Sequence, residues 1–138
     1  MKLLTPLLLV AILSEAQPSV VGRWKTVDDE SGEVKSIVEI AERKGTYYGK
    51  IVQLFTSDDP DPVCDKCPLE DERYGKKIIG MEIMKGLKKA GDEYSDGYIL
   101  DPEVGRIYRC TLWLEGPDLK VRGYWGPFYR TQTWKKST

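Results

Sequence analysis

Apolar and polar side chains alternate along most of the chain with a period of two, and turn residues interrupt the alternation at short intervals. Such alternation places successive side chains on opposite faces of extended strands, and the frequent turns are typical of sequential antiparallel pairing. In one segment, Ser36, Val38 and Ile40 share a face. The pattern predicts about eight strands, at Val21–Val27, Glu33–Ala41, Thr46–Phe55, Ile78–Leu87, Glu93–Asp101, Arg106–Leu114, Leu119–Tyr124 and Tyr129–Lys135.

The segment Thr56–Lys77 breaks the alternation, because it contains three prolines, two cysteines and many charges. We expect a long loop there, with one short helical turn near Leu69–Arg73. Loops of this length in compact domains are usually functional or covalently pinned.

A helix over Tyr74–Gly91 is the main alternative to the strand predicted at Ile78–Leu87. The apolar residues there have roughly helical spacing, but Gly80 and Gly86 disfavour a helix. We therefore favour the strand. The pattern as a whole predicts an all-β protein, with a single antiparallel up-and-down barrel.

The segment Met1–Ala16 has the three parts of a secretory signal peptide. Lys2 provides the positive start, Leu3–Leu13 is an apolar run broken only at positions 5 and 6, and small residues stand at positions 14 and 16. The apolar run is shorter than the roughly 20 residues that span a bilayer. We expect cleavage before Gln17, a periplasmic or secreted location, and one domain over residues 17–138 without a transmembrane segment.

The composition argues against several classes of function. The chain has a formal net charge of −1 with both signs interspersed, so it lacks the basic footprint of a nucleic-acid-binding protein. It contains no histidine, which removes the usual Ser-His-Asp and Cys-His catalytic arrangements and most zinc and copper sites. We expect no catalytic site, no metal and no cofactor.

The chain has three cysteines, Cys64, Cys67 and Cys110. In an oxidising compartment, two cysteines as close as Cys64 and Cys67 usually form a disulfide, which is the pairing we expect. The alternatives are a bridge to Cys110, a redox-active Cys-x-x-Cys motif and a three-thiolate zinc site. Cys110 shares an apolar face with Tyr108 and Leu112, which indicates a buried thiol.

Gly22-Arg23-Trp24 lies in the first predicted strand, and Arg130 lies in the last. This arrangement resembles the lipocalins and their relatives, whose first strand carries Gly-x-Trp and in which an arginine near the final strand packs over the tryptophan. The resemblance implies a barrel like those of lipocalins and fatty-acid-binding proteins, closed at one end by a cation–π contact between Arg130 and Trp24.

A second set of motifs covers nearly the whole mature chain: Gly22-Arg23-Trp24, Tyr48-Gly49-Lys50-Ile51, Val63-Cys64-Asp65-Lys66-Cys67, Gly80-Met81, Asp96-Gly97-Tyr98-Ile99-Leu100-Asp101-Pro102, Val121-Arg122-Gly123-Tyr124 and Arg130-Thr131-Gln132-Thr133-Trp134. They resemble a family of small exported bacterial proteins known as domain of unknown function 2147. One departure is Tyr129, where that family usually has glycine. The resemblance implies a fold and a compartment, and the family carries no established activity.

Aromatic residues are concentrated at positions 124–129, and exposed aromatics in a loop mark ligand or partner surfaces. An arginine that pointed inward would anchor a ligand carboxylate. Asp101 precedes Pro102 and suits a hairpin turn better than a catalytic role. The candidates for ligand binding or barrel closure are Trp24, Arg122, Tyr124, Trp125, Arg130 and Trp134.

Two functions follow from these observations. The first is a binding protein of the cell envelope, whose barrel holds a small apolar or amphipathic ligand. The second is a structural or interaction protein that presents the Cys64–Cys67 loop and the aromatic loop to a protein partner.

Overall fold

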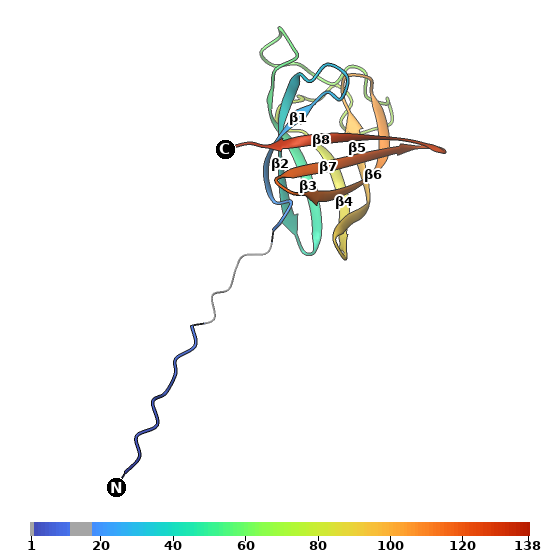
Figure 1. Ribbon diagram of the computed structural model, residues 1–138. Coiled ribbons are helices and arrows are strands. Elements are labelled where there is room, and N and C mark those ends of the chain that lie inside the picture. Colours follow the sequence, from blue (N-terminus) through green and yellow to red (C-terminus); the bar gives the residue numbers. More distant parts are fainter. Residues whose placement is uncertain (1, 12–17) are drawn as a thin grey trace.

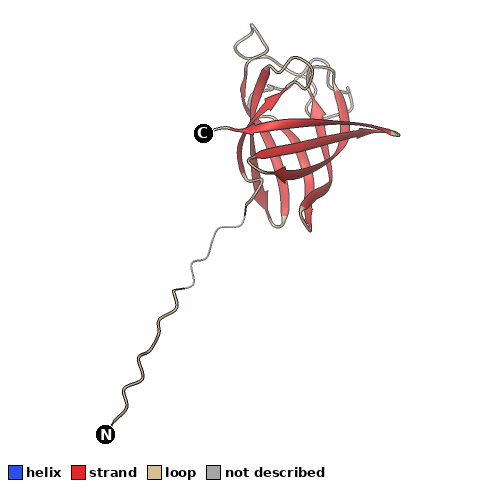
Figure 2. Ribbon diagram, viewed as in Figure 1, coloured by secondary structure: helices blue, strands red, loops and turns tan. Residues whose placement is uncertain are grey.

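The computed structural model of the protein describes residues 2–11 and 18–138, and within them it contains eight strands and no helix (Figure 2). The strands form a closed barrel in sequence order, each paired antiparallel with the next (Figure 1). The predicted up-and-down barrel is therefore confirmed. The strands are β1 (Gly22–Val27), β2 (Val34–Arg43), β3 (Thr46–Leu54), β4 (Glu82–Ala90), β5 (Glu93–Asp101), β6 (Arg106–Glu115), β7 (Asp118–Trp125) and β8 (Phe128–Lys136).

The barrel closes where β1 pairs with β8. In this pairing Trp24 lies opposite Lys136, and Lys25 lies opposite Lys135. On its other side β1 pairs with β2, where Trp24 lies opposite Val38. Because side chains alternate along a strand, Trp24 and Thr26 both point into the barrel and both are buried.

The two ends of the barrel differ (Figure 1). At the end that we call closed, β1 begins, β8 ends and the two-residue turns 44–45, 91–92 and 116–117 connect the strands. At the end that we call open lie the loop 28–33, the long connection 55–81 and the turns 102–105 and 126–127.

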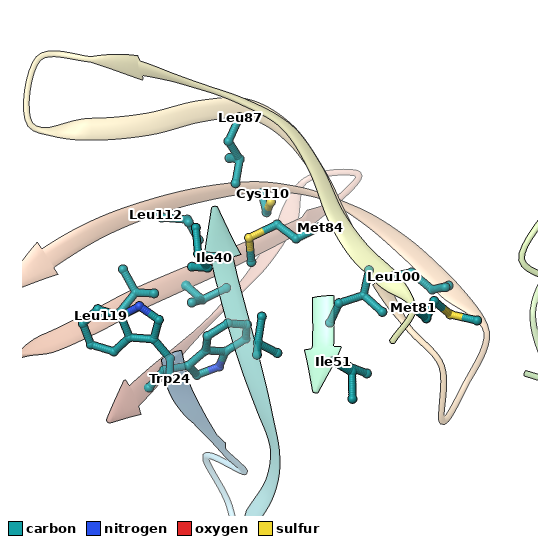
Figure 3. Close-up of a cluster of buried hydrophobic side chains, with 14 of the residues drawn as sticks. Trp24, Ile40, Ile51, Met81, Met84, Leu87, Leu100, Cys110, Leu112 and Leu119 are labelled. Carbon is teal, nitrogen blue, oxygen red and sulfur yellow. The ribbon is translucent and has the colours of Figure 1, made fainter. Parts of the chain in front are cut away.

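Large apolar side chains fill the closed half of the barrel. Figure 3 shows Trp24, Ile40 and Met84 pointing into the same interior from three strands. Gly97 belongs to this packing, because a Cβ atom there would lie 2.5 Å from Cγ of Leu87. Across the barrel and its loops together, the largest fully buried side chains among the described residues are Trp24, Trp134, Ile40, Met84, Leu87, Leu100, Leu112, Leu119, Val20, Val38, Cys64 and Cys110.

The region around β4 differs from the sequence prediction. The strand runs over Glu82–Ala90 rather than Ile78–Leu87, and the alternative helix over Tyr74–Gly91 is absent. Leu69–Arg73 forms hydrogen-bonded turns instead of the expected helical turn. A tight turn causes the later start of β4, because the amide of Met81 donates to the carbonyl of Ile78 at 3.0 Å.

The connection 55–81 is an ordered loop. Its two arms are joined at the bridge between Val63 and Lys77, and the amide of Cys64 donates to the carbonyl of Lys76 at 2.8 Å. Cys64 and Cys67 form a disulfide with a Cα–Cα distance of 5.5 Å, and both are buried. The expected disulfide is thus confirmed.

The predicted cleavage site at positions 14–17 lies outside the described residues. Within residues 2–11 and 18–138, no helix has the length and apolar character needed to cross a membrane.

Candidate functional site

A cavity of about 190 Å³ occupies the open half of the barrel. Its walls are largely apolar, and Trp134 separates it from the packed closed half. The lining residues come from every strand of the barrel and from the loops at the open end: Thr26, Lys35, Ser36, Ile51, Leu54, Thr56, Ile83, Ile99, Leu100, Asp101, Pro102, Glu103, Tyr108, Val121, Gly123, Arg130, Gln132 and Trp134.

Short polar side chains create part of this space. Thr26 and Ser36 point inward from neighbouring strands, and their hydroxyl oxygens lie 2.7 Å apart in a hydrogen bond. Gln132 accepts a hydrogen bond from Nε1 of Trp134 at 3.0 Å. Buried polar groups need such partners, so this end of the barrel tolerates polar residues where the closed half has large apolar ones.

Asp101 is the last residue of β5 and lines the cavity. Its Oδ1 accepts a hydrogen bond from the amide of Glu103 at 3.0 Å, which is the hairpin role expected from the sequence. Burial raises the pKa of this carboxyl above its ordinary value. Among the described residues, no basic group forms an ion pair with Asp101 within 4.0 Å.

Lys35 lies at the entrance of the cavity and joins two loops. Its Nζ lies 2.7 Å from a carboxylate oxygen of Glu103 and 3.3 Å from one of Asp28. The contact with Glu103 raises the pKa of Lys35. The amides of Ser31 and Glu30 donate to Asp28 and hold the pKa of its carboxyl at about 2.

Arg130, on β8, makes a second set of contacts with the loop 28–33. Its Nε donates to Asp29 at 2.6 Å and its Nη2 also contacts the carboxylate of Asp29, while Glu30 lies 3.5 Å away. The bidentate pair lowers the pKa of Asp29 and raises that of Arg130. Together, the contacts of Lys35 and Arg130 tie the loop 28–33 to the turn 102–105 and to β8.

The predicted closure of the barrel by Arg130 over Trp24 is wrong. Instead, Nζ of Lys136 lies 4.8 Å from the centre of the Trp24 ring, and Trp24 donates its indole hydrogen to the carbonyl of Val20 at 2.9 Å. The register explains the difference, since Lys136 is the residue paired with Trp24. Arg130 lies six residues earlier on β8, roughly 20 Å away at the rise of a strand.

Three other candidates lie outside the cavity, which corrects the expectation that they line a ligand site or close the barrel. Arg122 alternates with the cavity residues of β7 and faces outward. Its Cζ atom lies 4.8 Å from the centre of the Trp113 ring and 4.5 Å from the centre of the Tyr129 ring. Tyr124 also faces outward, while Trp125 is exposed at the β7–β8 turn. Of the six candidates, the structure brings only Arg130 and Trp134 to the cavity.

Cys110 is a free, buried thiol, as expected. Burial raises its pKa to about 12. Because Cys64 and Cys67 are bonded to each other, neither the bridge to Cys110 nor the three-thiolate zinc site forms.

The polar lining formed by Thr26, Ser36 and Gln132 was not expected from the sequence. The signal was present, since each has a large apolar residue two positions away on the same strand face: Trp24, Val38 and Trp134. A polar residue in phase with the core of a predicted strand indicates either a buried hydrogen-bonded pair or a cavity. The ion pairs at the entrance could not be expected in the same way, because the sequence of Asp28–Ser31 is typical of an ordinary turn.

The barrel is similar to a solved structure, that of protein HP1028 from the human pathogen Helicobacter pylori, which is described as belonging to the lipocalin family. The TM-score is 0.75 with 20% sequence identity, over 88% of this chain and 85% of that chain. This likeness shows the fold. A search of curated proteins finds no match.

A family model matches residues 22–136, which includes all eight strands. The second resemblance found in the sequence is therefore confirmed. On this evidence, the chain belongs to the family described as "Uncharacterized protein conserved in bacteria (DUF2147)".

Proposed function

We propose that this protein is exported and binds a small amphipathic molecule in the cavity at the open end of its barrel. The observation that carries the proposal is the cavity of about 190 Å³ inside a barrel whose other half is filled. Closed barrels with an unfilled interior are a common form of small-ligand site. The lipocalin-like fold agrees with binding rather than catalysis.

The volume limits the ligand. A protein cavity of about 150 Å³ accommodates benzene, so the space here suits an apolar body of about six to eight carbons. Each buried methylene contributes about 0.8 kcal/mol, so a six-carbon chain would contribute about 5 kcal/mol. This energy corresponds to a dissociation constant of about 0.1–1 mM.

The test is a titration of ¹⁵N-labelled protein with hexan-1-ol, followed by two-dimensional NMR. Binding in the cavity should shift the amides of Ile51, Val121 and Trp134 in a saturable manner. The amides of Leu112 and Leu119, in the packed half, serve as internal controls and should move much less. The absence of saturable shifts with hexan-1-ol, hexylamine and hexanoate up to 10 mM would overturn the proposal.

Export rests on the N-terminal pattern of Lys2 followed by Leu3–Leu13. Expression of the full chain in a Gram-negative host, followed by osmotic release of the periplasm, tests it. Mass spectrometry of the released protein should give a chain that begins at Gln17. A full-length product that remained in the cytoplasm would contradict export.

A second candidate function is docking of a protein partner at the β7–β8 turn. Trp125, Phe128 and Tyr129 are 55%, 69% and 64% exposed, and exposed aromatic clusters of this kind favour interfaces. Crosslinking in envelope preparations should then recover a defined partner with the wild-type chain but not with a Trp125→Ser/Phe128→Ser variant. An identical set of crosslinked products for both would exclude this turn as the docking surface.

A further inference from the structure

We propose that the ligand of the barrel cavity is a cation, a protonated amine on an apolar body of six to eight carbons, whose ammonium group pairs with Asp101. This inference rests on the proposed function and specifies the chemical class of the ligand. The basis is a difference among the charged side chains that line the cavity. Lys35, Glu103 and Arg130 have ion-pair partners among the described residues, and Asp101 has none.

Asp101 is the charged group that lines the cavity without an ion-pair partner in the described part of the chain. One of its oxygens accepts the amide of Glu103, and the other has no hydrogen bond in the described residues. A carboxylate in an apolar setting gains most from a cationic donor. An ammonium group is therefore the most favourable addition at this position.

The two basic residues at the entrance do not fill this role. Lys35 is held between Glu103 and Asp28, and Arg130 is held by Asp29. A ligand carboxylate would have to share either residue with the carboxylates that already hold it. An anionic ligand thus competes with existing contacts, whereas a cation does not.

The charge balance of the entrance points the same way. The charged residues that line the cavity, together with their ion-pair partners, are Asp28, Asp29, Glu30, Lys35, Asp101, Glu103 and Arg130. Five carboxylates and two basic groups give a net charge of −3. Carboxylate excess at a concave entrance raises the local concentration of cations and lowers that of anions.

The shape of the cavity gives the ligand a direction. Ile51 and Val121 form apolar walls, and Trp134 closes the inner end. Asp101 lies where β5 ends at the open end of the barrel. The apolar body would thus point toward Trp134 and the ammonium toward the entrance, where it keeps part of its hydration.

The contact should depend on pH, because only the ionised carboxylate attracts an ammonium group. Burial raises the pKa of Asp101 most, and the hydrogen bond from the amide of Glu103 lowers it. The carboxylate of Glu103 raises it further, Lys35 and Arg130 lower it, and the net direction is upward. An alkylamine stays protonated to about pH 10. The preference for an amine should therefore be constant near neutral pH and decline as the pH falls through the raised pKa of Asp101.

Three probes of equal chain length separate charge from burial: hexylamine, hexan-1-ol and hexanoate. Isothermal titration at pH 7 in low salt should give hexylamine about tenfold tighter binding than hexan-1-ol, and hexanoate weaker binding than either. In Asp101→Asn, the ratio of amine to alcohol affinity should fall to about one. Asparagine can still accept the amide of Glu103, so the turn is preserved.

Asp118→Asn is the matched control, because Asp118 lies at the closed end of the barrel and pairs with Lys135. It should leave the amine preference unchanged. Equal affinities for all three probes in the wild type, or tightest binding of hexanoate, would overturn the inference while leaving the proposed function intact. Failure of all three probes to bind would overturn both. If Asp101→Asn does not fold, the wild-type preference measured from pH 7 to 4 decides, and a preference that does not change with pH overturns the inference.

Discussion

Filling the cavity should abolish ligand binding and leave the barrel folded. Val121 is 4% exposed and lines the cavity from β7. In Val121→Phe, the added ring would occupy most of the available 190 Å³, since benzene fits a cavity of about 150 Å³. The newly buried apolar surface offsets the strain of placing a larger side chain, so we expect the free energy of unfolding to change by less than about 1 kcal/mol.

The same substitution in the packed half gives the matched control. Val38 is fully buried, and its Cγ1 lies 3.1 Å from where a Cβ atom on Gly49 would stand. No space exists there for a ring, so Val38→Phe should cost about 1–3 kcal/mol by overpacking. For a domain of this size, that loss lowers the melting temperature by about 4–12 °C.

Two measurements decide the outcome. Urea denaturation gives the free energy of unfolding of both variants, and titration with hexan-1-ol gives their affinity. We expect Val121→Phe to keep near-wild-type stability and to lose at least tenfold in affinity. If Val121→Phe is destabilised as much as Val38→Phe, the space beside Val121 does not accept a ring. If Val121→Phe still binds hexan-1-ol like the wild type, the cavity is not the ligand site.

Three further predictions concern the rest of the barrel. Because the pKa of Cys110 is raised to about 12, a thiol reagent should leave the native protein unlabelled. It should modify one thiol after denaturation and all three after denaturation and reduction. Labelling of the native protein would contradict this prediction. Lys136→Met removes the cation over Trp24 and should lower the free energy of unfolding in urea by about 0.5–1 kcal/mol. Lys136→Arg should keep the wild-type value. An unchanged free energy of unfolding in the Met variant would disprove the contribution of this contact. Arg73 holds the pKa of Asp71 at about 2 against an ordinary 3.8. The ionised carboxylate therefore stabilises the fold above about pH 4, and this stabilisation is lost between pH 4 and 2. Asp71→Asn should flatten that part of the pH–stability profile, and an identical acid limb in both proteins would refute the prediction.

The strand pattern was predictable because alternation with a period of two is a local property. Ser36, Val38 and Ile40 do point to one side of β2, as their spacing indicates. The start of β4 was not predictable in the same way. Ile78 and Met81 are both buried although they precede the strand, so their apolar character made the strand seem to begin too early.

The closure of the barrel depends on register, which alternation does not determine. Both Arg130 and Lys136 are basic residues on the last strand, and the family resemblance favoured the arginine. The pairing of β1 with β8 selects Lys136, because closure of a barrel fixes the stagger between first and last strands. The bidentate partner of Arg130, Asp29, is 101 residues away in the sequence.

The cavity is a property of the assembled barrel. It exists because the side chains at the open half include small ones, such as Thr26, Ser36 and Val121, while large apolar side chains fill the closed half. The size of each residue is visible in the sequence, but which residues meet at one level of the barrel depends on the stagger of all eight strands. The same holds for Asp101, whose turn role was predictable and whose position at the cavity was not.

β1 begins and β8 ends side by side at the closed end of the barrel (Figure 1). The amide of Ser137 still donates to the carbonyl of Arg23 at 2.9 Å, so the last strand is fixed to the first up to its final residues. The cavity opens at the opposite end. A linker added after Thr138 would therefore tether the protein to a sensor surface with its cavity facing the solution. A circular permutant that joined the start of β1 to the end of β8 would likewise leave the four connections at the open end uncut if it were opened at turn 91–92.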